Sequence, residues 1–202
     1  MTYDCNYLYI TDNLLDPSHV AWVHPTSFGD DSCKTQSAKI SVDALGVTVS
    51  RWMMDALVAP FYADLVPFAG HADRLQHYEV RFPANAIIKA KFVPAGEGGD
   101  QRSPDPANSF LMDSYNFITP ETERRSRYYW FQLRNVRPHD AALSEVMSQS
   151  VLDAFSEDLE VLNAVQKGMD ACGDNVISIA SDAGPLRFRH LIGAKIAAEA
   201  SR

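Results

Sequence analysis

The 202-residue sequence lacks the marks of several large protein classes. Its apolar runs, such as residues 56–61, fall far short of the roughly 18 residues that a membrane-spanning helix needs. Residues 1–25 show no basic start followed by an apolar stretch, so no signal peptide is predicted. Basic residues are not in excess either, because 18 Lys and Arg stand against 26 Asp and Glu and give a formal net charge of −8. Such a surface repels phosphate groups, so neither a membrane nor a nucleic acid is expected as a partner.

Cysteine is scarce, and its few positions are informative. Cys5, Cys33 and Cys172 are an odd number of widely separated residues, which favours reduced thiols in a cytoplasmic protein over a disulfide framework. None of them belongs to a C-x-x-C or C-x-H pattern, so the sequence contains no zinc-ribbon or iron–sulfur motif. What the sequence does have is a globular composition, with 46% apolar and 22% charged residues, and the length of one domain.

The hydrophobic periodicity differs between the two halves of the sequence. A helix is expected over 11–24, and the alternation that follows it is typical of half-buried strands. After Pro138, apolar residues recur at helical spacing, which predicts a long helix or a helix pair and then a surface helix over 183–200. Two hairpins are expected first, one over 35–54 that turns at Gly46 and one over 75–93 that turns at 83–85. An exposed loop over 94–108 follows them. Two more strands are expected at 109–118 and 125–135, joined by a turn at 119–122. This order predicts an α+β fold with helices packed on one face of an antiparallel sheet.

The first cluster with chemical meaning contains Asn13, Asp16, His19 and His24. Two histidines and a carboxylate can hold a divalent metal on one face and leave the other positions open, as in non-haem Fe(II) sites that activate O2. The His-x4-His spacing places the two rings about 140° apart on a regular helix. Both rings therefore reach one ion only if the helix bulges or breaks near residues 21–23. Taken alone, the pair also fits two ordinary surface or core histidines.

A third metal ligand has to come from a distant segment. The long helical region offers Asp153, Glu157, Asp158 and Glu160. Asp153 and Asp158 lie near the apolar stripe, whereas Glu160 falls on the side expected to be solvated. Helical spacing does not decide between Asp153 and Asp158, and the whole segment also fits a solvated helix face.

Five stretches of the sequence stand in an informative order. They are Asp12–His24 (DNLLDPSHVAWVH), Ile118–Glu123 (ITPETE), Tyr128–Trp130 followed by Arg134–Asn135, Ser156–Leu162 (SEDLEVL) and Ser181–Arg189 (SDAGPLRFR). Together they resemble the catalytic domain of Rieske non-haem iron oxygenases, in the branch of vanillate O-demethylase and dicamba monooxygenase. One departure is Arg127, at a position where this family commonly has histidine.

The resemblance implies roles for individual residues. It selects Asp158 as the third ligand, so that His19, His24 and Asp158 hold mononuclear Fe(II). Asp16 corresponds to a bridging carboxylate that is hydrogen-bonded to a ligand histidine and carries electrons from the Rieske cluster of a neighbouring subunit. Such a contact fixes the tautomer of the imidazole and tunes the metal. Asn13 corresponds to an amide beside the iron.

The resemblance also implies a fold and a reaction. Relatives have a helix-grip architecture, in which a curved antiparallel sheet and a long C-terminal helix enclose the iron and the pocket. Asn116 and Gln149 fall where relatives place substrate-facing side chains. The implied reaction is O2-dependent monooxygenation of a methyl group on a small aromatic, methoxylated acid, which releases formaldehyde and a phenol. Relatives assemble as homotrimers.

A complete member of this family carries an N-terminal Rieske domain with C-x-H and C-x-x-H ligands for a [2Fe–2S] cluster, and these motifs are missing from the sequence. We therefore expect residues 1–202 to be one catalytic domain, either as a fragment or with a cluster on another polypeptide. Its electrons are expected from NAD(P)H through a reductase.

Other functions fit part of the pattern. The same iron could serve an N-demethylase or a ring hydroxylase. In a different class, a helix-grip module could bind a small molecule without redox chemistry, although the intact His19, His24 and Asp158 favour the oxygenase.

Overall fold

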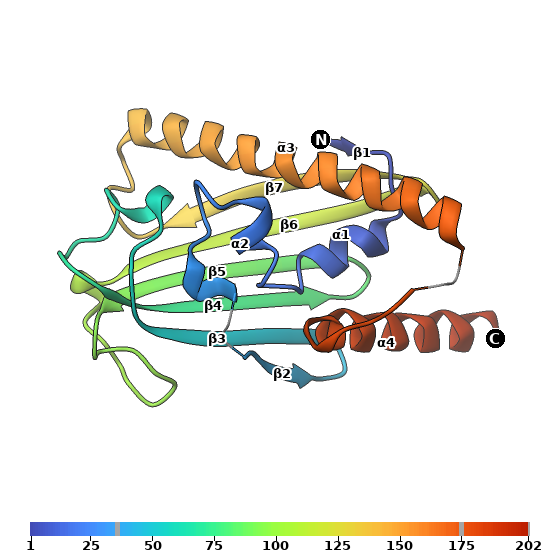
Figure 1. Ribbon diagram of the computed structural model, residues 1–202, viewed down its shortest axis with the longest axis horizontal. Helices are drawn as coiled ribbons and strands as arrows, with labels where there is room; N and C mark the ends of the chain where they lie inside the picture. Colours follow the sequence, from blue (N-terminus) through green and yellow to red (C-terminus); the bar gives the residue numbers. More distant parts are fainter. Residues whose placement is uncertain (35–36, 174–175, 202) are drawn as a thin grey trace.

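The computed structural model describes residues 1–34, 37–173 and 176–201. Seven antiparallel strands form one sheet that does not close on itself, and the helices lie against one of its faces (Figure 1). The longest helix follows the side of the sheet where its last strand lies (Figure 1). The expected α+β fold, with an antiparallel sheet and a long helix near the C-terminal end, is confirmed.

The strands follow one another as hairpins, so that neighbours in the sequence are mostly neighbours in the sheet. The exception is the short first strand, which pairs with the last one and brings the start of the chain to that edge. The strands are β1 (Thr2–Tyr3), β2 (Lys39–Val42), β3 (Gly46–Ala56), β4 (Ala72–Arg81), β5 (Asn85–Pro94), β6 (Phe110–Thr122) and β7 (Arg125–Arg134), in the order β1-β7-β6-β5-β4-β3-β2.

Two predicted hairpins are confirmed, and one predicted turn is wrong. β2 pairs with β3, and β4 pairs with β5, on either side of the expected turns. Residues 35–36 of the first expected hairpin lie outside the described residues. Residues 119–122 belong to β6 and not to a turn, because Thr119 and Pro120 still pair with Arg127 and Ser126 of β7. The connection between these strands is at residues 123–124.

The helices differ greatly in length. Single 3-10 turns connect some of the larger elements, at Asp31–Lys34, Pro60–Tyr62, Pro106–Asn108 and Ala180–Asp182. The α-helices are α1 (Tyr7–Asn13), α2 (Val20–Val23), α3 (Ala141–Cys172) and α4 (Ala183–Ala200).

The single helix expected over 11–24 is wrong. α1 begins earlier, because the side chain of Asn6 caps it by accepting a hydrogen bond from the backbone N–H of Leu8 at 2.9 Å. α1 ends at Asn13, and Pro17 lies in the turns that follow. Asp16 Oδ1 accepts a hydrogen bond from the backbone N–H of Ser18 at 2.8 Å, which stabilises a turn in place of a helix. The chain therefore changes direction before α2.

α3 is one continuous helix, not a pair. Asp140 caps its first turn by accepting a hydrogen bond from the backbone N–H of Leu143 at 2.9 Å. It ends before Gly173, whose φ of 62° is favourable for glycine. The buried side chains recur three or four residues apart and define one face: Met147, Val151, Ala154, Asp158, Leu162 and Gln166. A carboxylate therefore lies within the apolar face of this helix.

The bounds predicted for the last helix, α4, are confirmed. It packs on β3 and α1, on the same face of the sheet as the other helices (Figure 1). Across the described ranges, the structure contains no helix that combines the length and the apolar character needed to cross a membrane.

The two larger apolar clusters lie between the sheet and the helices that cover it. One joins α1, α3 and α4 to strand residues such as Val49, Val80 and Tyr128. The other gathers around Tyr62 and Phe92. The cavity described below borders both clusters, because its wall includes Tyr78 from the first and Tyr62 from the second.

Candidate metal centre and adjoining cavity

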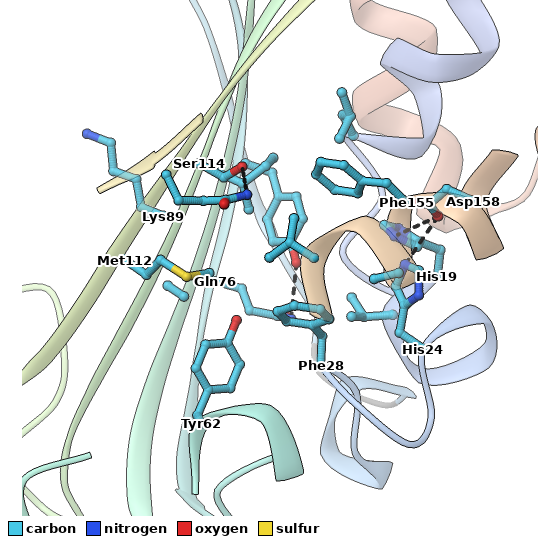
Figure 2. Close-up of a pocket in the computed structure, with 18 of the residues that line it drawn as sticks. His19, His24, Phe28, Tyr62, Gln76, Lys89, Met112, Ser114, Phe155 and Asp158 are labelled. Carbon is cyan, nitrogen blue, oxygen red and sulfur yellow. Dashed lines mark hydrogen bonds and ion pairs between the residues drawn. The ribbon is translucent and has the colours of Figure 1, made fainter. Parts of the chain in front are cut away.

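His19, His24 and Asp158 converge beside the inner face of the sheet (Figure 2). One possible ligand atom from each lies within 4.8 Å of the others. The Nε2 atom of His24 is 3.2 Å from Asp158 Oδ1, and the Nε2 atom of His19 is 3.9 Å from the same oxygen. Two imidazole nitrogens and one carboxylate oxygen therefore face a common point.

The awkward His-x4-His spacing is solved by a very short helix. α2 is a single turn with His19 as its N-cap and His24 as its C-cap. The backbone at His24 has left the helical conformation, with φ −120° and ψ 45°. The helix thus ends directly after Val23, where the sequence predicted a break, and the two rings meet at nearly right angles with centroids 5.4 Å apart.

Gly29 holds this turn in place. Its backbone N–H donates to the carbonyl of His24 at 2.9 Å. A Cβ atom at this position would lie 2.1 Å from the carbonyl oxygen of Val20 and 3.0 Å from that of His24. Only glycine allows the chain to approach so closely, so residue 29 helps to define where the histidines point.

Hydrogen bonds to the other ring nitrogens orient both imidazoles. Nδ1 of His24 donates to Glu157 Oε2 at 2.6 Å, and Nδ1 of His19 donates to the backbone carbonyl of Asp16. With the protons on Nδ1, the Nε2 lone pairs of both rings are free for a metal ion.

The contact at Asp16 corrects an expectation. The sequence predicted that its carboxylate would bond to a ligand histidine, but the backbone carbonyl makes that contact. The carboxylate oxygen Oδ1 instead accepts hydrogen bonds from the backbone N–H and hydroxyl of Ser18. The reason is local, because an Asp side chain readily bonds to the second residue after it in a turn. Glu157 is the carboxylate that touches a ligand histidine, His24.

The resemblance implied that Asn13 is an amide beside the iron, and its side chain does contact one of the three candidate ligands. Its Nδ2 atom donates to Asp158 Oδ1 at 3.1 Å. This amide ties the end of α1 to the middle of α3, although the two residues are 145 positions apart. Asp153, the alternative ligand in the sequence, is exposed and accepts a hydrogen bond from Gln149 at 2.8 Å.

Burial and charge act in opposite directions at this cluster. Burial alone lowers the pKa of an imidazole, but the hydrogen bonds and negative charges of Asp158 and Glu157 raise the pKa of His24 above its usual value. Burial works against ionisation of Asp158, yet its hydrogen bond with His24 and the charges of both histidines lower its pKa. Asp158 is therefore an anionic ligand, and protons compete with a metal for His24.

The donor set fits a divalent transition metal. Two imidazoles and one carboxylate on one side of a point form the facial arrangement that leaves coordination positions open for other ligands. The three ligands line one end of a cavity, so the open positions of a bound metal would face that cavity (Figure 2). Of the residues that the structure describes, these three are the only metal-type cluster of His, Cys, Asp and Glu side chains.

The cavity is apolar along most of its wall and polar at two ends. Its apolar wall is formed by Leu14, Val20, Phe28, Tyr62, Ile88, Ala90, Met112, Val151, Ala154 and Phe155. His19, His24 and Asp158 form the helical end, and Arg74, Gln76, Tyr78, Ser114 and Gln132 come from the strands. Figure 2 shows Gln76 and Ser114 across the cavity from Asp158, with Phe155 and Phe28 between them. An apolar space with a few placed polar groups suits a small aromatic ligand.

Asn116 and Gln149 are not among the residues that line this cavity. Asn116 is buried in the sheet, where its Oδ1 accepts a hydrogen bond from the hydroxyl of Tyr128 at 2.9 Å. Gln149 is exposed on α3 and donates to Asp153. Both amides therefore form hydrogen bonds within the protein. Neither lies in the wall of the cavity, so the geometry does not support the expected contact with substrate.

Sequence reasoning missed several residues that shape the centre. Glu157 was one of four carboxylates in the helical region, and only its contact with His24 distinguishes it. Gly29 and Arg74 carried no local signal at all. The alternation of β4 could have placed Arg74 on the same face as Tyr78, but not beside the histidines.

Comparisons with known proteins show the family and the fold of the chain. Residues 3–198 match the family described as the vanillate O-demethylase oxygenase C-terminal domain. The chain is 36% identical over 202 residues to a toluene-4-sulfonate monooxygenase system iron-sulfur subunit of Comamonas testosteroni, covering 98% of this chain and 58% of that protein. It is 31% identical over 206 residues to a vanillate O-demethylase oxygenase subunit of a Pseudomonas species, covering 96% and 56%. The chain thus spans little more than half the length of these relatives.

The fold is similar to that of dicamba monooxygenase. The crystal structure of that enzyme bound to 3,6-dichlorosalicylic acid superposes with a TM-score of 0.86 at 21% identity, covering 100% of this chain and 58% of the other. A second structure of the same enzyme, with non-heme iron and dicamba, gives a TM-score of 0.77 at 19% identity and covers 57% of that chain.

Proposed function

The chain belongs to the family of vanillate O-demethylase oxygenase C-terminal domains, and on this premise we propose that it is the catalytic domain of a mononuclear non-haem iron monooxygenase. The observation that carries the proposal is the cluster of His19, His24 and Asp158 at the end of an apolar cavity. Its substrate would be a small aromatic acid that carries a methyl or methoxyl group, and the reaction would resemble O-demethylation.

The residues of the chain provide the binding and the orientation. His19, His24 and Asp158 would hold Fe(II), which, when bound, supplies the activation of O2. Glu157 and the Asp16 carbonyl fix the two rings with Nε2 toward the metal. The apolar wall excludes water and holds an aromatic ring against the open side of the cluster.

Electrons would come from outside this domain, from NAD(P)H through a reductase and a [2Fe–2S] Rieske cluster. Support for the entry point comes from Asp16, because its carbonyl contacts His19 and the same residue lines a second cleft. Asn13 borders the same cleft and contacts Asp158. We infer that the Rieske domain of a neighbouring subunit in a homotrimer docks there. A cytoplasmic location stays a prediction from the scattered cysteines.

The test is the stoichiometry of Fe(II) after anaerobic reconstitution of the wild type, Asp158→Ala, His19→Ala and Asp153→Ala. We expect one iron per chain in the wild type and an affinity reduced by more than about 100-fold in the first two variants, because removing a direct ligand costs more than losing an outer contact. Asp153→Ala is the matched control, since it removes an exposed carboxylate from the same helix.

Two results would contradict the proposal. One is a wild-type protein without specific iron, which would leave a small-molecule binding module as the remaining function. The other is a loss of iron in Asp153→Ala equal to that in Asp158→Ala, which would show that the metal does not lie at the proposed cluster.

A further inference from the structure

The strand end of the cavity contains a buried cation with an unused donor. Arg74 is 2% exposed. Its Nη1 donates to Asp30 Oδ2 at 3.1 Å, and its Nη2 donates to the carbonyl of Phe28 at 2.9 Å. Its Nε is also buried and has no hydrogen-bond partner among the described residues. Buried donors almost always have an acceptor, so this N–H calls for one that the described part of the chain does not supply.

The guanidinium of Arg74 is held firmly. Its central carbon lies 5.3 Å from the ring centre of Tyr62 and 5.1 Å from that of Phe92. These aromatic faces and the ion pair with Asp30 fix the orientation of the group. Arg74 is one of the residues in the wall of the cavity, and its guanidinium is thus a preorganised cationic donor there, with one N–H that has no partner among the described residues.

Tyr78 supplies a second donor on the same face of β4. Its hydroxyl accepts a hydrogen bond from Nε2 of Gln76 at 3.3 Å, which leaves the hydroxyl proton available for another acceptor. Gln76 keeps this orientation because its Oε1 accepts from Nε of Arg51 at 2.8 Å. Burial raises the pKa of Tyr78, so the hydroxyl remains a donor throughout the neutral range.

Lys89 is not an alternative anchor. It borders the cavity, but the alternation of β5 turns its side chain to the other face of the sheet, and Figure 2 shows its amino group pointing away from the labelled cavity residues. Arg51 is fully engaged with backbone carbonyls and Gln76 and does not line the cavity.

We propose that Arg74 and Tyr78 bind the acidic group of the substrate, a carboxylate or sulfonate on an aromatic ring, and so determine both its class and its direction. The acidic group lies at the strands, and the opposite end of the ring faces His19, His24 and Asp158. The inference rests on the proposed function for the reaction, but the binding that it describes can be measured without turnover.

The experiment compares an acid with a neutral molecule of the same shape. The dissociation constants of 4-methoxybenzoate and 4-methoxybenzamide are measured by calorimetry, with and without Fe(II), for the wild type, Arg74→Gln, Tyr78→Phe and Arg81→Gln. The last variant is the matched control, because Arg81 is on the same strand but points to the opposite face, where it pairs with Asp43 and Glu79. 4-Methylbenzenesulfonate distinguishes a site for carboxylates from one for sulfonates.

We expect the wild type and Arg81→Gln to bind the acid about 30-fold more tightly than the amide, as charge-assisted hydrogen bonds imply. Arg74→Gln should lose this preference while its affinity for the amide changes little. Tyr78→Phe should reduce affinity for the acid about 5-fold, in keeping with the loss of one neutral donor.

An equal affinity of the wild type for both probes, or no binding of either, overturns the inference. So does a preference for the acid that survives both Arg74→Gln and Tyr78→Phe. If Arg74→Gln fails to fold, as near-UV circular dichroism would show, Tyr78→Phe decides alone because it preserves the ring. Iron stoichiometry on the same samples separates the two proposals, since a protein that prefers the acid but binds no iron contradicts only the oxygenase.

Discussion

At the helical end of the cavity, His24 has a carboxylate near each ring nitrogen, whereas at the strand end Arg74 keeps one buried N–H without a partner among the described residues. The distances of His24 to Glu157 and Asp158 are 2.6 and 3.2 Å. The ligands of the first end are thus oriented by contacts within the chain, and the second end is arranged for a group from outside. This difference suits a resident metal at one end and an exchanging substrate at the other.

The two ends are also built differently. The helical end depends on a tight turn and one long helix, in which a single close contact can move both histidines. The strand end depends on alternating residues of a regular sheet. We expect a substitution there to disturb the positions of its neighbours less than a substitution in the tight turn does. The following predictions test this contrast.

The largest effect is expected at Gly29. Gly29→Ala and Gly46→Ala both bring a Cβ too close to a backbone carbonyl, that of Val20 at 2.1 Å and that of Val80 at 2.0 Å. Each should lower the free energy of unfolding by about 3 kcal/mol, as overpacking does. Only Gly29→Ala should also weaken Fe(II) binding, because Gly46 begins a strand remote from the turn.

Chemical denaturation and iron titration measure these two quantities separately. A Gly29→Ala protein that binds iron like the wild type would show that the turn adapts and that the helical end is less rigid than its contacts indicate.

A smaller effect is expected from Glu157, which orients a ligand without touching the metal. Glu157→Gln should weaken Fe(II) binding about 10-fold, because outer contacts of a ligand histidine typically contribute 10- to 100-fold. Glu160→Gln is the matched control on an exposed position of the same helix. An unchanged iron affinity in Glu157→Gln would show that His24 needs no help from this carboxylate.

The smallest effects are expected from the two amides that the sequence placed near substrate. Asn116→Ala should destabilise the fold by about 1 kcal/mol, because it removes the acceptor of the buried Tyr128 hydroxyl. Gln149→Ala should change stability by less than about 0.5 kcal/mol, since its side chain is exposed. Neither should alter the affinity for 4-methoxybenzoate, and calorimetry that finds a large loss would return these residues to the substrate site.

Much of the fold followed from periodicity. The hairpins and α4 could be predicted because alternating or helical spacing records which side of an element is buried. The segment from Tyr7 to His24 could not, because its helices are short and Pro17 and Asp16 favour turns as much as a helix start. The turn predicted at 119–122 failed for a related reason, since pairing with β7 overrides the local preference of Pro120.

The sequence by itself determined the chemistry that is available: two histidines on one short segment, carboxylates on a helix, and no iron–sulfur motif. The tertiary structure decided which of those carboxylates meets the histidines, and it placed Arg74 and Tyr78 in the wall of the same cavity. The physical reason is range. Spacing along a chain fixes directions within one element, but His24 and Glu157 are 133 residues apart, and only the packing of α3 against the turn and the sheet brings them together.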